Sequence, residues 1–391
     1  MLAVPFTGPG SGTAELTWGQ RAIMQAMRRE RSWLPMGGHR PVAAGTTVAD
    51  VVAELRYTME RWQSFRTRIR DGRQDVAASG IAVLEVVPAD GGDPAEIAAS
   101  VEAGYRATGL DLAADWPMRM AVVCDRGVPA RLVAVMPHLV TDGLGAAAMV
   151  AESTRREPSP PAGPQPLDLA AWQASPAGAR QDTAARRHWE RHADGLAPFS
   201  APALPQRYRK CVLDSAALAT GLPAAAARLG ADESTVLLAA YMAALARVTG
   251  RETIAVRPVV SNRFRPGLSD VVTPLAQLGL CVASVPPSFP DAVAAVSRAA
   301  LAARKYAYYD PYATEPLPTP CFNDRRAMSS GGGGSPSPAL AWSVQPGPTE
   351  PLFLHVDGVP GAVRLLFDVD TACFSPASVE AVAVCMVSLV G

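Results

Sequence analysis

The sequence lacks a net charge. Its 391 residues include 36 Lys and Arg and 36 Asp and Glu. A nucleic-acid-binding protein usually carries an excess of basic residues, because its affinity depends on neutralising phosphates. We therefore expect no nucleic-acid partner.

The sequence also lacks the marks of a membrane or secreted protein. No stretch approaches the roughly 18 uninterrupted apolar residues of a membrane span. The N-terminus has no basic region followed by an apolar one, so it does not resemble a secretory signal. Hydrophobic residues make up 49% of the chain and charged residues 18%, which excludes global disorder. We expect a soluble cytoplasmic protein without a membrane partner.

Metal-ligand patterns are missing as well. The six cysteines form no CxxC pair and no compact cluster with histidine, which predicts buried thiols rather than a zinc site. His188 and His192 have helical i, i+4 spacing but no third ligand nearby, so we interpret them as a solvated helix face. His39 and His355 have no chemical partner close by in the sequence. No resident metal or cofactor is expected. The cysteines are Cys124, Cys211, Cys281, Cys321, Cys373 and Cys385.

The chain does show an alternation of helical and strand patterns. This alternation occurs once in each half of the sequence. The best linker is the Pro-rich stretch 158–166, and the order of elements begins again after it. We predict an α/β fold of two pseudo-symmetric lobes, 1–165 and 166–391. The Gly/Pro-rich residues 1–14 are interpreted as a loose lead-in. The run Gly331–Ser335 is interpreted as a flexible loop, and natural and engineered origins both stay open.

Apolar periodicity predicts the individual elements. Strands are expected over 65–70, 81–87, 117–124, 131–136, 209–213, 253–260, 282–285, 340–344, 352–356 and 363–369. Helices are expected over 15–27, 47–63, 93–108, 144–152, 184–196, 216–229, 232–248, 291–306 and 375–389. Arg66 and Arg68 alternate with apolar residues and are interpreted as the solvated face of a strand.

The segment 135–143 combines local geometry with chemistry. His138 follows the apolar strand pattern 131–136 and precedes the helix pattern that begins at 144. A loop between a strand and a helix is a common place for a catalytic side chain. Asp142 lies four residues later in the same loop, and Gly143 permits a tight backbone turn. A serine-hydrolase site is excluded because no GxSxG elbow is present.

Six segments in order give this chain a family resemblance. It resembles the condensation-domain superfamily of nonribosomal peptide synthetases, which is related in fold to chloramphenicol acetyltransferase. MPHLVTDG (136–143) is similar to the family's MHHxxSDG signature. The other matching segments are TWGQ (17–20), RWQSFRTRI (61–69), DLAAW (168–172), HWERHADGL (188–196) and NRFRPGLSDVV (262–272).

The resemblance implies two lobes that form a V with a central tunnel, and His138 at its middle. An acyl or peptidyl thioester on the phosphopantetheine arm of a carrier protein would meet an amine or hydroxyl acceptor there. His138 would act as general base or position the acceptor, and the Gly143 backbone N–H would help to stabilise the oxyanion. Asp142 would be structural and paired with Arg263. No adenylation or carrier segment is seen, so we expect a free-standing member of the family. We also expect a monomer.

One departure from the family keeps two alternatives open. Pro137 replaces the first histidine of the family's pair and removes a backbone donor at the end of its strand. The first alternative is a CoA-dependent acyltransferase that uses the same histidine, although the plant-type DFGWG motif is absent. The second is a non-catalytic domain that recruits a carrier protein or a tailoring enzyme. The intact pattern His138-x-x-x-Asp142-Gly143 argues against the second.

Overall fold

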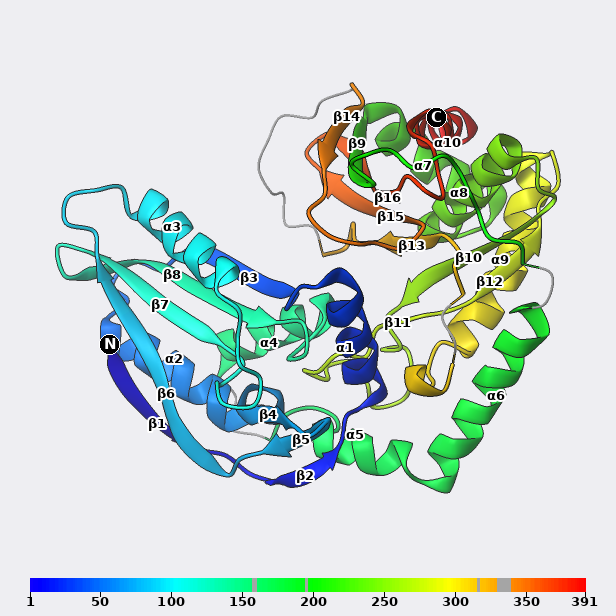
Figure 1. The fold of residues 1–391 in the computed structure, drawn as a ribbon. Coiled ribbons are helices and arrows are strands. Elements are labelled where there is room, and N and C mark those ends of the chain that lie inside the picture. Colours follow the sequence, from blue (N-terminus) through cyan, green and yellow to red (C-terminus); the bar gives the residue numbers. More distant parts are fainter. Residues whose placement is uncertain (157–159, 194–195, 315–316, 329–338) are drawn as a thin grey trace. The chain divides into compact units, whose positions relative to one another are not determined.

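Strand β7 (Arg119–Asp125) is apolar along its length because both of its faces are covered. Met120 and Val122 belong to one hydrophobic cluster, and Ala121 and Val123 to another. Successive side chains of a strand point to opposite faces of its sheet. The strand therefore lies in the centre of a three-layer arrangement, with helix α2 (Val48–Arg61) on one face and α3 (Pro94–Ala107) on the other (Figure 1).

The structure is a computed structural model, and it describes residues 1–391 except 157–159, 194–195, 315–316 and 329–338. The described residues form two compact units. Unit 1 comprises residues 1–28, 32–179 and 263–275, and unit 2 comprises 29–31, 180–262 and 276–391. The chain thus re-enters unit 1 at Arg263, long after it has left it. The lobes predicted with a boundary at 165/166, their V-shaped arrangement and the tunnel stay predictions.

Unit 1 contains a five-stranded sheet and a three-stranded sheet. The five-stranded sheet has the order β1-β6-β7-β8-β3, in which only β6 and β7 are parallel. Its other strands are β1 (Leu2–Thr7), β6 (Ser79–Pro88), β8 (Val128–Pro137) and β3 (Pro35–Pro41). The smaller sheet has the order β2 (Gly12–Glu15), β5 (Arg73–Val76) and β4 (Thr67–Arg70).

The helices of unit 1 begin where the sequence offers caps. Thr47 and Asp50 form a reciprocal capping box at the start of α2, and Asp93 caps α3. The remaining helices are α1 (Trp18–Glu30), whose last two residues belong to unit 2, the 3-10 helix η1 (Gln63–Arg66), α4 (Gly143–Arg155) and α5 (Pro166–Gln173).

The prediction that residues 1–14 are a loose lead-in was wrong. They contribute β1 and most of β2, and Val4 and Phe6 are buried in the core of unit 1. Pro5 is accommodated because β1 is the edge strand of its sheet, where a missing backbone donor is tolerated.

The prediction for Arg66 was also wrong. Its side chain is fully buried, and its guanidinium donates hydrogen bonds to the carbonyl oxygens of Gly10 (2.7 Å), Ala77 (2.6 Å) and Pro9. An arginine can be buried when such acceptors surround it. Arg68 lies over the ring of Trp116, 3.7 Å from its centroid. Neither side chain is the freely solvated basic group that the alternating pattern predicted.

Unit 2 is built on an eight-stranded sheet in the order β11-β10-β13-β15-β16-β9-β14, with β12 also paired to β10. Strands β15 (Leu352–Val359) and β16 (Ala362–Asp370) contain the predicted strands 352–356 and 363–369 and pair as an antiparallel hairpin. The other strands are β9 (Tyr208–Ser215), β10 (Thr253–Val260), β11 (Gln277–Leu278), β12 (Cys281–Ser284), β13 (Cys321–Asp324) and β14 (Ala341–Val344).

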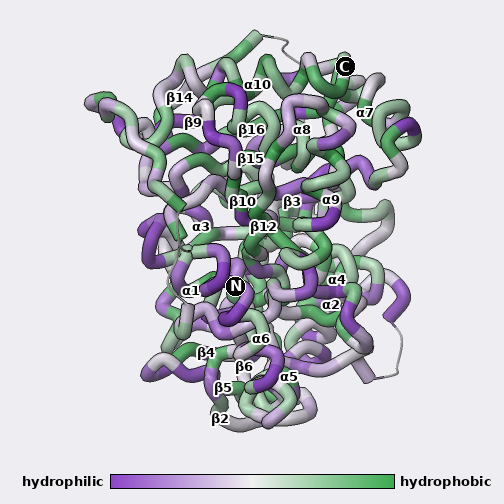
Figure 2. Tube along the Cα trace, turned by 90° about the vertical axis from the view of Figure 1, so that its right-hand side faces the viewer, coloured by the Kyte–Doolittle hydropathy of each residue, from purple (hydrophilic) through white to green (hydrophobic). Residues whose placement is uncertain are grey.

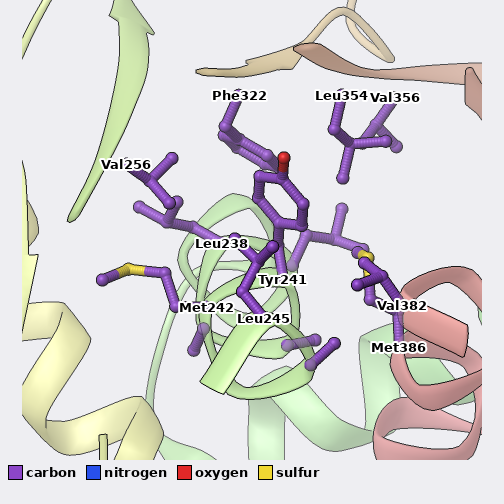
Figure 3. Packing of buried hydrophobic residues seen from close by; sticks show 14 of the residues in the cluster. Leu238, Tyr241, Met242, Leu245, Val256, Phe322, Leu354, Val356, Val382 and Met386 are labelled. Atoms are coloured by element: carbon purple, nitrogen blue, oxygen red, sulfur yellow. The ribbon is translucent and has the colours of Figure 1, made fainter. Parts of the chain in front are cut away.

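The core of unit 2 surrounds helix α8 (Glu233–Thr249). Tyr241 is fully buried in the middle of α8, among side chains from β10, β13 and β15 and from α10 (Pro376–Val390) (Figure 3). Helix α10 is hydrophobic along most of its length, as a helix of the core should be (Figure 2). The other helices are α6 (Pro176–Ala193), which begins in unit 1, α7 (Ala216–Leu229), α9 (Phe289–Lys305) and the 3-10 helix η2 (Pro311–Ala313).

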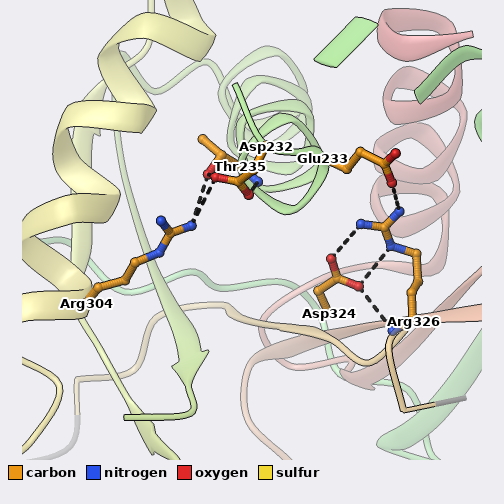
Figure 4. Close-up of polar contacts among 6 residues, drawn as sticks. All are labelled: Asp232, Glu233, Thr235, Arg304, Asp324 and Arg326. Carbon is orange, nitrogen blue, oxygen red and sulfur yellow. Dashed lines mark hydrogen bonds and ion pairs between the residues drawn. The ribbon is translucent and has the colours of Figure 1, made fainter. Parts of the chain in front are cut away.

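Polar contacts fix the start of α8 (Figure 4). Asp232 caps the helix by accepting a hydrogen bond from the Thr235 N–H at 2.9 Å, and Arg304 of α9 donates to the Thr235 hydroxyl at 3.1 Å. Arg326 pairs with Glu233 at 2.5 Å and with Asp324 at 2.8 Å. These contacts explain why the apolar helix begins at residue 233.

His188 corrects another prediction, because it is buried rather than solvated. Its Nε2 lies 2.9 Å from the Leu280 carbonyl oxygen, and its ring stacks on Tyr306. Burial lowers the pKa of His188. The Nδ1 of His192 lies 2.8 Å from the His188 carbonyl oxygen, so both histidines have structural partners.

His39 and His355 also have partners that the sequence did not reveal. The Nδ1 of His39 lies 3.0 Å from Glu102, and the Nε2 of His355 lies 3.4 Å from Asp368. Each pair joins residues of different elements, so proximity along the chain could not predict it.

The two sheets share a pattern of strands. In unit 1, neighbouring β6, β7, β8 and β3 are related as parallel, antiparallel and antiparallel. In unit 2, neighbouring β13, β15, β16 and β9 have the same relations in the same order. A helix follows β8 in unit 1 and β16 in unit 2. The prediction of an α/β fold with repeated organisation is confirmed at the level of sheet topology.

Among the described residues, no single helix is long and apolar enough to cross a membrane. Helices α7 and α8 pass that test only as a pair, which bends by 100°. Their apolar residues form much of the core of unit 2.

Candidate functional site

His138 lies at the point where β8 has ended and α4 has not yet begun. Its backbone N–H donates to the carbonyl oxygen of Leu34 at 3.0 Å, which fixes the main chain at this residue. The side chain is partly exposed, while its Nδ1 atom is buried and has no hydrogen-bond partner within the described part of the chain. His138 is therefore anchored through its main chain, and no carboxylate among the described residues binds its Nδ1 atom.

Pro137 fits its strand without the loss of a hydrogen bond. It lies opposite Pro35 of β3, so two residues without N–H groups face each other. The hydrogen bond from His138 to Leu34 belongs to the next pair along the ladder. Narrow and wide pairs alternate in antiparallel strands, which places Pro137 and Pro35 in a pair that exchanges no hydrogen bonds. The donor that Pro137 removes is one that β3 does not need, and the ladder between β8 and β7 already ends at the pair Val135 and Arg119.

Asp142 is the polar centre of the site. Its carboxylate accepts hydrogen bonds from the backbone N–H groups of Gly145 and Leu275, each at 2.9 Å, and pairs with the guanidinium of Arg263. Asp142 and Arg263 are both buried, with side chains 6% and 7% exposed. A buried charge needs such partners, because desolvation otherwise disfavours it. Asp142 thus caps α4 and holds a distant segment against the cap.

Gly145 is required by this arrangement. A Cβ atom at residue 145 would collide with the hydroxyl oxygen of Thr141 and would lie 2.6 Å from Nη2 of Arg263. Residue 145 of the helix must therefore be glycine, because Arg263 lies against its backbone to reach Asp142. Neither Gly145 nor the Leu275 N–H was singled out from the sequence. The only signal for Gly145 is a glycine in the first turn of a predicted helix, which local patterns do not explain.

The segment 263–275 is attached to unit 1 at further points. The Ser64 hydroxyl donates to the Val272 carbonyl oxygen at 2.7 Å, and Leu268, Val271 and Leu275 form a buried cluster with Leu169 of α5. Ser64 belongs to the segment 61–69, one of the six that carried the family resemblance. Its hydrogen bond helps to attach segment 263–275, which supplies the partners of Asp142, to the rest of unit 1.

Helix α4 is fixed at both ends. Gly143 is its first residue, and the backbone N–H groups of a helix's first turn favour negative charge. Near the other end, Glu152 forms a buried ion pair with Arg61 of α2. The N-terminus of α4 thus has a defined position beside His138, from which its backbone donors can meet an anion.

No group of three or more histidine, cysteine, aspartate or glutamate side chains in the described part of the chain is arranged to hold a metal ion. The four predicted site residues, His138, Asp142, Gly143 and Arg263, all lie in unit 1. The Asp142 side chain is engaged by the helix cap and by Arg263, so a catalytic relay from Asp142 to His138 is not supported.

The family model named Condensation domain matches residues 51–313. This match covers most of the chain and includes His138, Asp142, Gly143 and Arg263. The protein therefore belongs to the condensation-domain family, as the motif order predicted. No curated protein sequence matches the chain.

Solved structures show the same fold at low sequence identity. A condensation domain that mediates chain release from the enacyloxin polyketide synthase has a TM-score of 0.78 and 21% identity, over 98% of this chain and 82% of that one. The X-domain from teicoplanin biosynthesis has a TM-score of 0.72 and 19% identity, over 96% and 94%. SgcC5 from Streptomyces globisporus has a TM-score of 0.70 and 16% identity, over 96% and 97%.

Proposed function

We propose that the chain is a condensation-type acyltransferase. It moves an acyl or peptidyl group from the phosphopantetheine thioester of a carrier protein to an amine or hydroxyl acceptor. The observation that carries this proposal is the division of roles around His138. The Asp142 carboxylate is engaged in structural contacts, whereas His138 is fixed through its main chain and its imidazole makes no ion pair among the described residues.

In the proposed reaction His138 accepts the proton of the acceptor as its nitrogen or oxygen attacks the thioester carbonyl carbon. Imidazole suits this task because its ordinary pKa lies near neutrality. The tetrahedral intermediate then collapses, the carbon–sulfur bond breaks, and the thiolate takes the proton back from His138. If the acceptor loses its proton elsewhere, His138 still contributes by holding the acceptor in line with the carbonyl.

Gly143 is proposed to stabilise the oxyanion of the intermediate. Its N–H belongs to the first turn of α4, where the helix dipole favours negative charge. The ion pair of Asp142 with Arg263 and the buried pair of Glu152 with Arg61 keep that turn in place. On this proposal the two ion pairs keep His138 and Gly143, the residues with chemical roles, in place.

A second function, recruitment of a partner enzyme, is favoured by one similarity. A further solved relative is the complex of the X-domain and OxyB from teicoplanin biosynthesis, with a TM-score of 0.69 and 20% identity to this chain over 96% of this chain and 92% of that one. On this reading the chain would bind a carrier protein or a tailoring enzyme without turnover. The engaged Asp142, together with a His138 Nδ1 atom that has no hydrogen-bond partner among the described residues, supports the catalytic proposal.

A donor comparison tests the proposed function. The same acyl group is offered on a loaded carrier protein and on CoA, each with a panel of amine and alcohol acceptors, and products are identified by mass spectrometry. The proposal expects amide or ester formation from the carrier-bound donor, well above the rate without protein. Product from the CoA donor alone would support the alternative, a CoA-dependent acyltransferase of the same superfamily. Binding of the carrier protein without product from either donor would support recruitment.

A further inference from the structure

Strand β3 is an edge strand of its sheet, and an arginine binds its outer side. The sheet of unit 1 ends at β3, so one row of its backbone groups has no strand partner. Arg106 of α3 donates to the carbonyl oxygens of Pro35 at 3.0 Å and Gly37 at 2.7 Å. These residues are two apart and lie in pairs that exchange no hydrogen bonds with β8, so their carbonyl groups point outward.

The last turns of α3 are joined to the same segment by two more contacts. Glu102 accepts a hydrogen bond from Arg106 at 2.7 Å, and its carboxylate lies 3.0 Å from Nδ1 of His39. The indole N–H of Trp33 donates to the Arg106 carbonyl oxygen at 3.0 Å. Arg106 and Glu102 of α3 thus form a polar clamp, a set of contacts that holds residues 33–39 against the helix.

The end of α3 is itself fixed to the sheet. Arg119 of β7 donates to the carbonyl oxygens of Thr108 at 2.6 Å and Gly109 at 2.7 Å, just beyond the helix. It also donates to the Tyr105 carbonyl oxygen at 3.2 Å. The position of Arg106 is thus set by β7 in the centre of the sheet and not only by the edge strand β3.

The clamped segment contains the residue that holds His138. Leu34 lies between Trp33 and Pro35, and its carbonyl oxygen accepts the His138 N–H at 3.0 Å. Leu34 has a φ of 48° and Gly37 has a φ of 99°. Such a conformation is unfavourable for leucine and persists only where the surroundings impose it. Without the clamp, we expect the segment to relax and the acceptor of the His138 N–H to move.

We propose that Arg106 is a positioning residue for His138, acting through Pro35, Gly37 and the Leu34 carbonyl oxygen. The catalytic part of this inference rests on the proposed acyl transfer, whereas the structural part does not. The planar guanidinium bridges two carbonyl oxygens at once and still reaches Glu102. Lysine has a single ammonium group and cannot reproduce that fork.

The test uses Arg106→Gln, Arg106→Lys and, as matched control, Arg40→Gln. Arg40 lies on the same strand but pairs with Glu54 through an exposed side chain and binds no carbonyl oxygen of β3 in the described contacts. Hydrogen exchange is measured at the His138 amide in the absence of substrate. We expect exchange to be about 10-fold faster in Arg106→Gln, intermediate in Arg106→Lys, and unchanged in Arg40→Gln. Unchanged exchange in Arg106→Gln would overturn the inference.

Steady-state kinetics with the donor that the wild type accepts is the second measurement. Misplacing a catalytic group costs turnover more than binding, so we expect kcat of Arg106→Gln to fall about 10-fold or more with KM nearly constant. An equal loss in Arg40→Gln, or a change in KM alone, would contradict positioning. A wild type that turns over no donor refutes the proposed function, whereas the exchange measurement still decides the role of Arg106.

Discussion

Asp142 and Arg263 lie 121 residues apart in the sequence and form a buried ion pair within one compact unit. The pair brings segment 263–275 back to the N-terminus of α4, directly after His138. Leu275 adds a backbone hydrogen bond to the same carboxylate. The candidate site therefore depends on a long-range contact that both holds the unit together and fixes the loop that carries His138.

Replacing Asp142 with alanine should lower the stability of the protein strongly. The change leaves the buried guanidinium of Arg263 without its counterion, and removing one partner of a buried pair costs about 3–5 kcal/mol. Urea unfolding measures the effect. Asp75→Ala is the matched control, because the Asp75–Arg70 pair is 32% and 49% exposed, and a surface pair contributes at most about 1 kcal/mol. An Asp142→Ala variant as stable as the wild type would refute the structural role.

Gly145→Ala should destabilise the protein although alanine favours helices. The added Cβ would meet the Thr141 hydroxyl and Arg263 within the ion pair. Gly104→Ala in α3 is the control, since nothing lies within 4 Å of its Cβ position. That substitution should stabilise the protein by about 0.5–1 kcal/mol. Thermal unfolding of both variants checks the contrast, and a shift of the same sign in both would remove the proposed constraint on Gly145.

His188 should make the protein sensitive to mild acid. Burial lowers its pKa in the folded state below the ordinary value of 6.5. Above that value neither the folded nor the unfolded state binds the proton, so stability is full. Below it, the unfolded state binds a proton that the folded state resists, and stability falls.

His188→Gln retains a donor for the Leu280 carbonyl oxygen without a titrating group. Unfolding free energies measured from about pH 8 to about pH 5.5 should therefore fall less steeply in the variant than in the wild type. Some dependence should remain, because burial also lowers the pKa of His355. Parallel curves for the two proteins would show that His188 does not contribute.

Much of the fold could be predicted from periodicity, because its core elements are strongly patterned. Helix α7 and strand β10 have the predicted bounds, and strands β15 and β16 contain the predicted ones. Several strands were missed, among them the edge strands β1 and β3 and the short central strand β13. Strand β3 contains Gly37 and Gly38, and its shape depends on Arg106, which the local sequence cannot show.

The site was predicted less completely than the fold. His138 and Asp142 stand close together in one loop, so a local pattern locates both. The link to Arg263 came from a family resemblance, since no local property marks one arginine as buried. Arg66 shows the same limit, because the carbonyl oxygens that surround it come from residues 9, 10 and 77. Long-range polar contacts of this kind leave no trace in periodicity.

The most direct test of the account is the first turnover of His138→Ala with a carrier-bound donor. The variant is mixed in excess with acyl-loaded carrier protein and acceptor, and product is followed by mass spectrometry, after circular dichroism has shown an unchanged fold. Loss of general base catalysis predicts a rate at least about 100-fold below that of the wild type. A wild-type rate of product formation in the folded variant would contradict a chemical role for His138.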